Sequence, residues 1–185
     1  EERFEPSSAT DKDDAFFVDS GATYDGSSTS TITGLSHLEG QVVQILADGA
    51  THPDKTVSSA QITLDRAASV VHVGLKYTST IRTLPVEVPT PTGTSQGKTK
   101  RISQLLIRVY MSLGGQYGPD ASTLDRILYR SGSTPMDSSP PLHTGDKILS
   151  FNGKYDTLAQ YSIIHDEPLP FTLLAISPRL ETQKR

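Results

Sequence analysis

A chain of 185 residues is long enough to bury a hydrophobic core, and its lack of cysteine excludes disulfides, zinc–thiolate centres and cysteine nucleophiles. The formal net charge of -4 argues against general adhesion to nucleic acid, although a local basic edge is compatible with it. With 35% hydrophobic residues, 14 glycines and 12 prolines, the composition predicts a turn-rich β protein. No apolar run approaches the ~20 residues that span a bilayer, so no membrane contact is expected.

The N-terminal half is predicted to hold a flexible segment followed by a β-rich part. Residues 1–14 are acidic, begin without Met, and are expected to be a flexible segment cut from a longer chain. The first β-rich part, 15–84, contains short β-branched and aromatic runs. Residues 20–26 have turn chemistry, and Asp48-Gly49 directly after a strand predicts a hairpin. The expected strands are 15–19, 29–33, 41–47, 61–64 and 69–75.

The C-terminal half is predicted to begin with a crossover and continue as a second β-rich part. Residues 85–100 are rich in proline and glycine, which predicts extended chain. In the second β-rich part, 101–180, apolar residues alternate along 101–111 as they do in a strand. Asn152-Gly153 predicts the clearest hairpin of the chain, because Asn-Gly favours a type I′ turn. The final expected strand pair is 162–165 with 171–176.

Taken together, these elements predict an all-β, mainly antiparallel fold. Short strands at close spacing are typical of a sandwich or a small barrel, with few or no long helices. The two β-rich parts can pack as one domain or stand as two.

One segment comes close to a nucleotide-binding loop. Residues 93–99 read G-T-S-Q-G-K-T, but only three residues separate the glycines, where a P-loop requires four. A P-loop also leaves a buried strand and opens a helix, whereas here prolines precede it and strand-like alternation follows. We therefore expect no nucleotide site.

The only local basic cluster of this acidic chain consists of Lys98, Lys100, Arg101 and Arg108. In a regular strand, the alternation of side chains puts Lys98 and Lys100 on the same face as Arg108, where they can meet phosphate or an acidic partner. The alternative is edge protection, since lysines on an edge strand discourage aberrant pairing. We favour edge protection.

No residue pattern predicts catalysis, a metal or a cofactor, and we expect that the protein is not an enzyme. The five histidines have no metal-binding spacing, and the chain contains no G-x-S-x-G nucleophile elbow. The acidic pairs Asp13-Asp14 and Asp166-Glu167 lie beside terminal or turn sequences and are interpreted as solvated loop acids. With no Trp, a carbohydrate-stacking surface would depend on Tyr and Phe, most of which are expected in the core.

A series of short segments, taken in order, resembles the C-terminal region of the tail nozzle or stabilisation proteins of tailed phages, relatives of tail tubular protein B. Each segment is short and non-catalytic, so the specificity lies in their order. The segments are 17–26, 34–40, 45–49, 71–79, 96–102, 144–147 and 168–176.

The resemblance implies a β-rich structural protein of the virion, produced in the host cytoplasm and located in the phage tail. It implies a homo-oligomeric ring below the head-to-tail connector, in contact with the adaptor and with fibre or spike proteins. DNA would pass through this ring without specific binding, which an acidic wall with few basic residues favours. No cofactor and no catalytic residue are implied.

Two other functions remain open from the sequence. The first is a receptor- or glycan-binding β-module of a phage tail or cell surface, with tyrosines in loops as the contact residues. The second is a polysaccharide hydrolase with dispersed carboxylates, which sequence alone does not locate.

Overall fold

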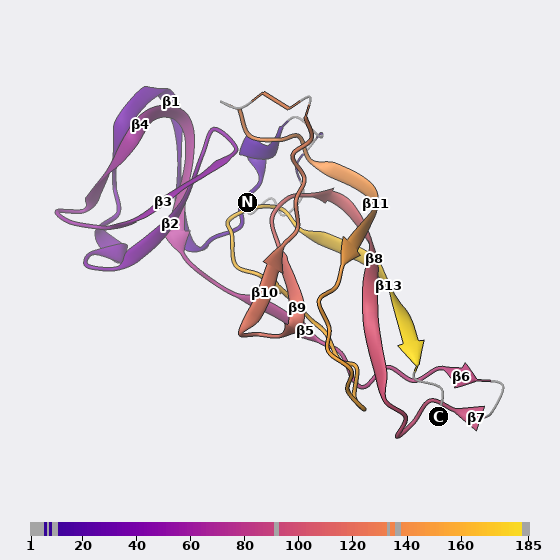
Figure 1. Cartoon of the computed structure of the whole chain (residues 1–185). Helices are drawn as coiled ribbons and strands as arrows, with labels where there is room; N and C mark the ends of the chain where they lie inside the picture. The colour runs from indigo at the N-terminus through magenta and orange to yellow at the C-terminus, as the bar shows by residue number, and fades with distance from the viewer. Residues whose placement is uncertain are drawn as a thin grey trace.

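The computed structural model describes residues 6, 8, 11–90, 93–132, 134–135 and 138–182. Most of the predicted flexible segment 1–14 lies outside these residues. The described chain is mainly antiparallel β with two single-turn 3-10 helices (Figure 1). This confirms the predicted all-β fold class. The elements are η1 (Lys12–Asp14), β1 (Asp19–Thr33), η2 (Ser36–Leu38), β2 (Val42–Ala47), β3 (Ala50–Thr56), β4 (Gln61–Leu75), β5 (Ser79–Arg82), β6 (Pro89–Thr90), β7 (Gly93–Thr94), β8 (Lys100–Ser112), β9 (Gln116–Asp120), β10 (Thr123–Arg126), β11 (His143–Ser150), β12 (Ser162–His165) and β13 (Thr172–Thr182).

The N-terminal part is one four-stranded sheet in the order β1-β4-β2-β3 (Figure 1). Its two longest strands, β1 and β4, pair along their length with several register shifts. Register irregularities bend strands, so the sheet curls around a core made largely by its own side chains. Leu35 and Leu38, which flank and end the η2 turn, complete this core and are almost fully buried.

The C-terminal part is a sandwich of two sheets. One sheet has the order β10-β9-β12-β5 and the other has the order β11-β8-β13, while β6 and β7 form a small separate hairpin. The buried faces of the two larger sheets meet in a single cluster that includes Leu105, Ile107 and Val109 of β8 and Tyr117 and Ile163 of the opposite sheet. Alternating burial along β11 also fits a face-to-face packing of sheets.

The two parts pack on each other through β2. This strand is buried on both faces, because Ile45 points into the N-terminal core while Leu46 packs with Leu113, Leu142 and Leu169 of the C-terminal part. Polar groups reinforce the contact around one residue, Asp166. Its backbone oxygen accepts a hydrogen bond from the Gln44 side chain at 2.6 Å, and its carboxylate lies 2.8 Å from Lys76 Nζ.

The Asp48-Gly49 hairpin prediction is confirmed. It joins β2 to β3, with Ala47 paired to Ala50. Both turn residues have positive φ, 48° for Asp48 and 67° for Gly49, as a type I′ turn requires.

The Asn152-Gly153 hairpin prediction is wrong. Neither residue has positive φ, and the chain beyond β11 does not fold back on that strand. It continues beside β8, where the Phe151 N–H donates to the Ser103 carbonyl at 3.0 Å and Asp156 pairs with Lys100. Tertiary pairing to a central strand thus overrides the local turn preference.

Other strand predictions need correction. The expected turn at 20–26 is part of β1, whose irregular register absorbs the turn-forming residues, and the two strands expected at 61–64 and 69–75 are one strand, β4. The segments 162–165 and 171–176 do not pair with each other: β12 joins β5 and β9, whereas β13 joins β8.

The boundary between the two parts also differs from the sequence expectation. Strand β5 falls within the range 15–84, yet it pairs with β12 in the C-terminal sandwich. The chain therefore leaves the N-terminal sheet after β4. No helix in the described part of the chain is long and apolar enough to cross a membrane.

Candidate functional site

The predicted basic cluster is divided between the interior and the surface. Lys100 is fully buried, and its Nζ donates to Glu87 Oε1 at 2.8 Å and to the Ser95 carbonyl at 3.4 Å. The Ser95 hydroxyl donates to the other Glu87 oxygen at 3.0 Å. The hydrogen bond from Lys100 lowers the pKa of Glu87, assisted by the one from Ser95. This ion pair links the two ends of the crossover, residues 85–100.

The prediction that Lys98 and Lys100 share a face with Arg108 is wrong. Ile102 of β8 pairs with Leu180 and Gln104 pairs with Arg179, so β8 has one extra residue, Ser103. This bulge inverts the alternation of side chains, which leaves Lys100 buried and Arg108 exposed.

The remaining basic residues have local roles in the described structure. The Arg108 guanidinium makes a bidentate contact with Asp146 on β11, with N–O distances of 2.6 and 2.8 Å, and this lowers the pKa of the carboxyl. Arg101 Nε lies 3.9 Å from Glu181, and Lys98 lies in a turn that its N–H closes on Ser95. Eight residues of strand span about 26 Å, so Arg108 is also distant from the other three.

The segment 93–99 does not have the geometry of a phosphate-binding loop. It comprises β7 and a turn in which Gly97 has a φ of 71°, and it leads into strand β8, not into a helix. The predicted strand at 101–111 is confirmed as β8, which lies at the centre of its sheet.

Three of the histidines have structural partners. His72 bonds the Thr23 hydroxyl at 2.8 Å and the Asp13 carbonyl at 2.6 Å, while His52 Nε2 accepts the N–H of Asp65 at 2.9 Å. His37 Nε2 lies 2.9 Å from the Ser20 carbonyl. Within the described residues, no group of three or more His, Asp or Glu side chains is placed to hold a metal ion.

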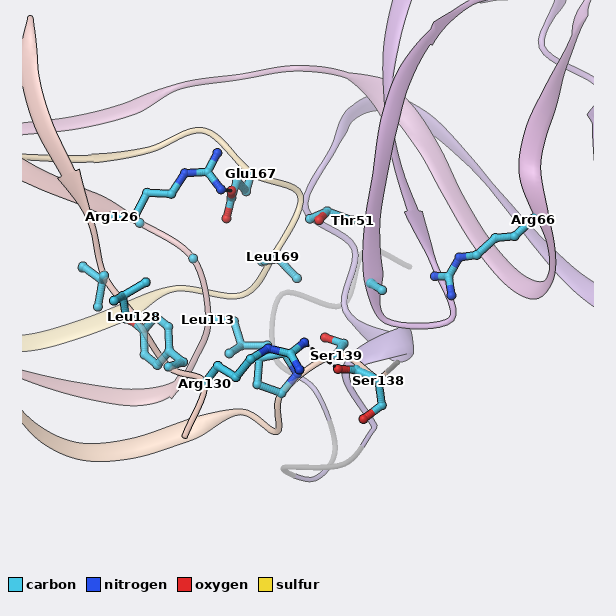
Figure 2. Close-up of a pocket in the computed structure, with 16 residues that line it drawn as sticks. Thr51, Arg66, Leu113, Arg126, Leu128, Arg130, Ser138, Ser139, Glu167 and Leu169 are labelled. Atoms are coloured by element: carbon cyan, nitrogen blue, oxygen red, sulfur yellow. Dashed lines mark hydrogen bonds and ion pairs between the residues drawn. The ribbon is translucent and has the colours of Figure 1, made fainter. Parts of the chain in front are cut away.

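A pocket of about 450 Å³ lies where the two parts meet (Figure 2). The start of β3 and Arg66 of β4 form one wall, and the end of β10 with loops of the C-terminal part forms the rest. Its lining residues are Ala50, Thr51, Arg66, Leu113, Gly114, Gly115, Arg126, Ile127, Leu128, Tyr129, Arg130, Ser138, Ser139, Pro140, Glu167 and Leu169.

The charged residues of this pocket are three arginines and one glutamate. Arg66 and Arg130 approach from opposite walls (Figure 2), and each is oriented by backbone carbonyls: Arg66 Nη2 donates to Ala47 at 2.9 Å, and Arg130 Nη2 donates to Ser138 at 2.8 Å. Neither has an ion-pair partner within the described part of the chain. Arg126 lies 3.7 Å from Glu167, so the pocket has excess positive charge.

Polar groups without partners lie beside the pocket. His165 is 7% exposed, and its Nε2 has no hydrogen-bond partner in the described structure. A Cβ on Gly114 would lie 3.2 Å from this nitrogen and 2.6 Å from Glu167 Oε2, so only glycine fits between these groups without a shift. Burial lowers the pKa of His165, which favours the neutral ring. The Tyr129 hydroxyl is also buried and unpaired, and burial raises its pKa.

Sequence reasoning missed this pocket. Its arginines lie on separate strands and loops without periodic spacing, and Glu167 was interpreted as a solvated loop acid. Only the packing of the N-terminal sheet against the C-terminal loops places Arg66 and Arg130 around the same pocket.

A second surface feature is the outer face of the sheet β11-β8-β13. Register places Ile148 beside Leu106, and the Arg108–Asp146 pair lies on the next row. Ile148 is 68% exposed and Leu174 of β13 is 59% exposed. Strands β11 and β13 are the edges of this sheet.

No family model matches this chain, and no curated protein matches its sequence. The structure itself defines the class of protein: a two-part, mainly antiparallel β protein with a sandwich in its C-terminal part.

Proposed function

We propose that this chain is a structural module of a phage tail, part of the nozzle that extends the head-to-tail connector and surrounds the DNA conduit. The observation that carries the proposal is the ordered series of segments that resembles tail nozzle proteins along most of the chain. In this role the module forms a homo-oligomeric ring and contacts other tail proteins.

The positions of these segments in the fold support a structural role. Segments 17–26 and 71–79 meet where Gly21 and Gly74 pack against Val18; a Cβ on either glycine would lie within 2.8 Å of that side chain. Other segments also form joints of the fold. Segment 34–40 supplies core leucines, 45–49 makes the β2–β3 hairpin, and 96–102 contains the buried Lys100.

The outer face of the sheet β11-β8-β13 supports assembly. Exposed Ile148 and Leu174 offer apolar surface, and the two edge strands offer unpaired backbone groups. In a ring, a neighbouring subunit would cover this face.

The distribution of basic residues favours free passage of DNA. Lys100 is buried and Arg108 is paired with Asp146, so neither is suited to bind DNA phosphates in a channel. With a formal net charge of -4, the module has weak attraction for a polyanion.

Labelling of purified phage particles with an antibody raised against this chain tests the proposal. We expect label on the tail directly below the head, at a fixed distance from the connector. An antibody against the major capsid protein of the same particles is the control for labelling of intact virions. Label only at fibre tips, or none on particles that react with the control antibody, would contradict the proposal.

A further inference from the structure

The pocket between the two parts concentrates positive charge in an acidic chain. Three arginines face one glutamate there, and Arg66 and Arg130 are held by neutral carbonyls, so each retains N–H donors. A guanidinium binds a carboxylate through two parallel hydrogen bonds. The opposite walls therefore present two groups suited to an anionic substituent.

The same pocket holds acceptors that a simple anion would not use. The Glu167 carboxylate repels phosphate or sulfate but accepts hydrogen bonds from hydroxyl groups. The Glu167 carboxylate lines the pocket with 26% of its side chain exposed, so a hydroxyl of a ligand can donate to it. The ligand that uses both features carries an anionic group and several hydroxyls.

The size and the apolar walls of the pocket restrict the class of ligand further. Its volume of about 450 Å³ lies within the ~300–1,000 Å³ range of ligand pockets. Leu113, Leu169 and Pro140 supply apolar surface for the C–H face of a ring. These dimensions suit one or two sugar rings.

We propose that this pocket binds an acidic saccharide, with its carboxylate held by Arg66 and Arg130 and its hydroxyls held by Glu167. The site is independent of the proposed tail function, because it lies at the joint of the two parts and involves neither the outer face of β11-β8-β13 nor its edges. Arg66 and Arg130 are exposed, so the affinity for a monosaccharide is expected to be modest.

Titration of the full chain, followed by chemical-shift changes of its backbone amides, tests the proposal. The probes are galacturonate, galactose, acetate and inorganic phosphate, compared at equal ionic strength. We expect saturable shifts around the pocket with galacturonate, and binding of galactose and acetate at least about tenfold weaker, a difference of ~1.4 kcal/mol. Arg66→Ala and Arg130→Ala should each weaken galacturonate binding about fivefold or more.

The controls separate loss of the site from loss of the fold. Arg82→Ala removes an exposed arginine of β5 and should leave the binding unchanged. Glu167→Gln removes the repulsion of anions but weakens the hydrogen bonds to hydroxyls, so it should strengthen phosphate binding relative to galacturonate binding. No saturable binding of galacturonate, equal binding of acetate or phosphate, or unchanged affinity in both pocket arginine variants would overturn the proposal.

Discussion

At the scale of single residues, the internal Lys100 shows how a charged side chain serves the fold. Its ammonium is fully buried, while its partner Glu87 keeps 39% of its side chain exposed. An unpaired buried ammonium is costly, whereas an apolar side chain of similar length at that place is often tolerated. Losing the negative charge of Glu87 is therefore expected to destabilise the fold more than losing the positive charge of Lys100.

We predict that Glu87→Gln lowers the Tm more than Lys100→Met does. The first change leaves the ammonium without its counter-charge, and the second removes the charge that needs one. Thermal unfolding followed by far-UV circular dichroism at pH 7 measures both values. A larger decrease in Tm for Lys100→Met would contradict the interpretation that Glu87 is needed mainly to neutralise the buried ammonium.

The same pair predicts a pH dependence. The folded-state pKa of Glu87 is lowered from its ordinary value of 4.5, so the unfolded chain binds more protons in the window just below that value. The stabilisation is thus present above about pH 4.5 and is lost as the pH falls through the lowered pKa. The Tm difference between the wild-type chain and Glu87→Gln should shrink across that window.

At the scale of elements, local sequence patterns predict the structure where no distant strand competes. Asp48-Gly49 joins two strands that are adjacent in sequence and in the sheet, and it forms the expected turn. Asn152-Gly153 has an equally strong turn preference, but its flanks pair with β8, some 50 residues earlier. The bulge at Ser103 has no local pattern that marks it, so the face of each basic residue along β8 was not predictable.

The joint between β1 and β4 depends on glycine for space. A Cβ on Gly74 would lie 2.7 Å from the Asp19 carbonyl oxygen and 2.8 Å from Val18 Cβ. We predict that Gly74→Ala costs about 1–3 kcal/mol of unfolding free energy through overpacking. Gly132→Ala is the matched control, because a Cβ there meets nothing within 4 Å. Urea unfolding of the two variants checks this, and equal stabilities would contradict the close packing.

At the scale of the whole molecule, the joint between the two parts decides whether they behave as one unit. Leu46, Leu113, Leu142 and Leu169 form this joint, and each comes from a different segment of the chain. The pocket with its arginines exists only because of this packing. That explains why the fold class could be predicted from the sequence while the pocket could not.

We predict that Leu46→Ala costs about 2–5 kcal/mol, as expected for a cavity at a buried site. Leu46 is 1% exposed. The control is Leu84→Ala: Leu84 is 84% exposed, so this substitution should change the unfolding free energy by less than about 0.5 kcal/mol. Amide hydrogen exchange should show the loss of protection on both sides of the joint. Loss confined to the N-terminal sheet would indicate that the parts are energetically separate.

The central claim is that this chain forms part of a tail ring. Electron cryo-microscopy of phage particles that carry the full-length protein tests it most directly. The account predicts a ring of density around the tail channel below the connector that fits both β parts, with Ile148 and Leu174 covered by a neighbouring subunit. Density for this fold at a fibre tip, or a particle in which no ring accommodates it, would contradict the account.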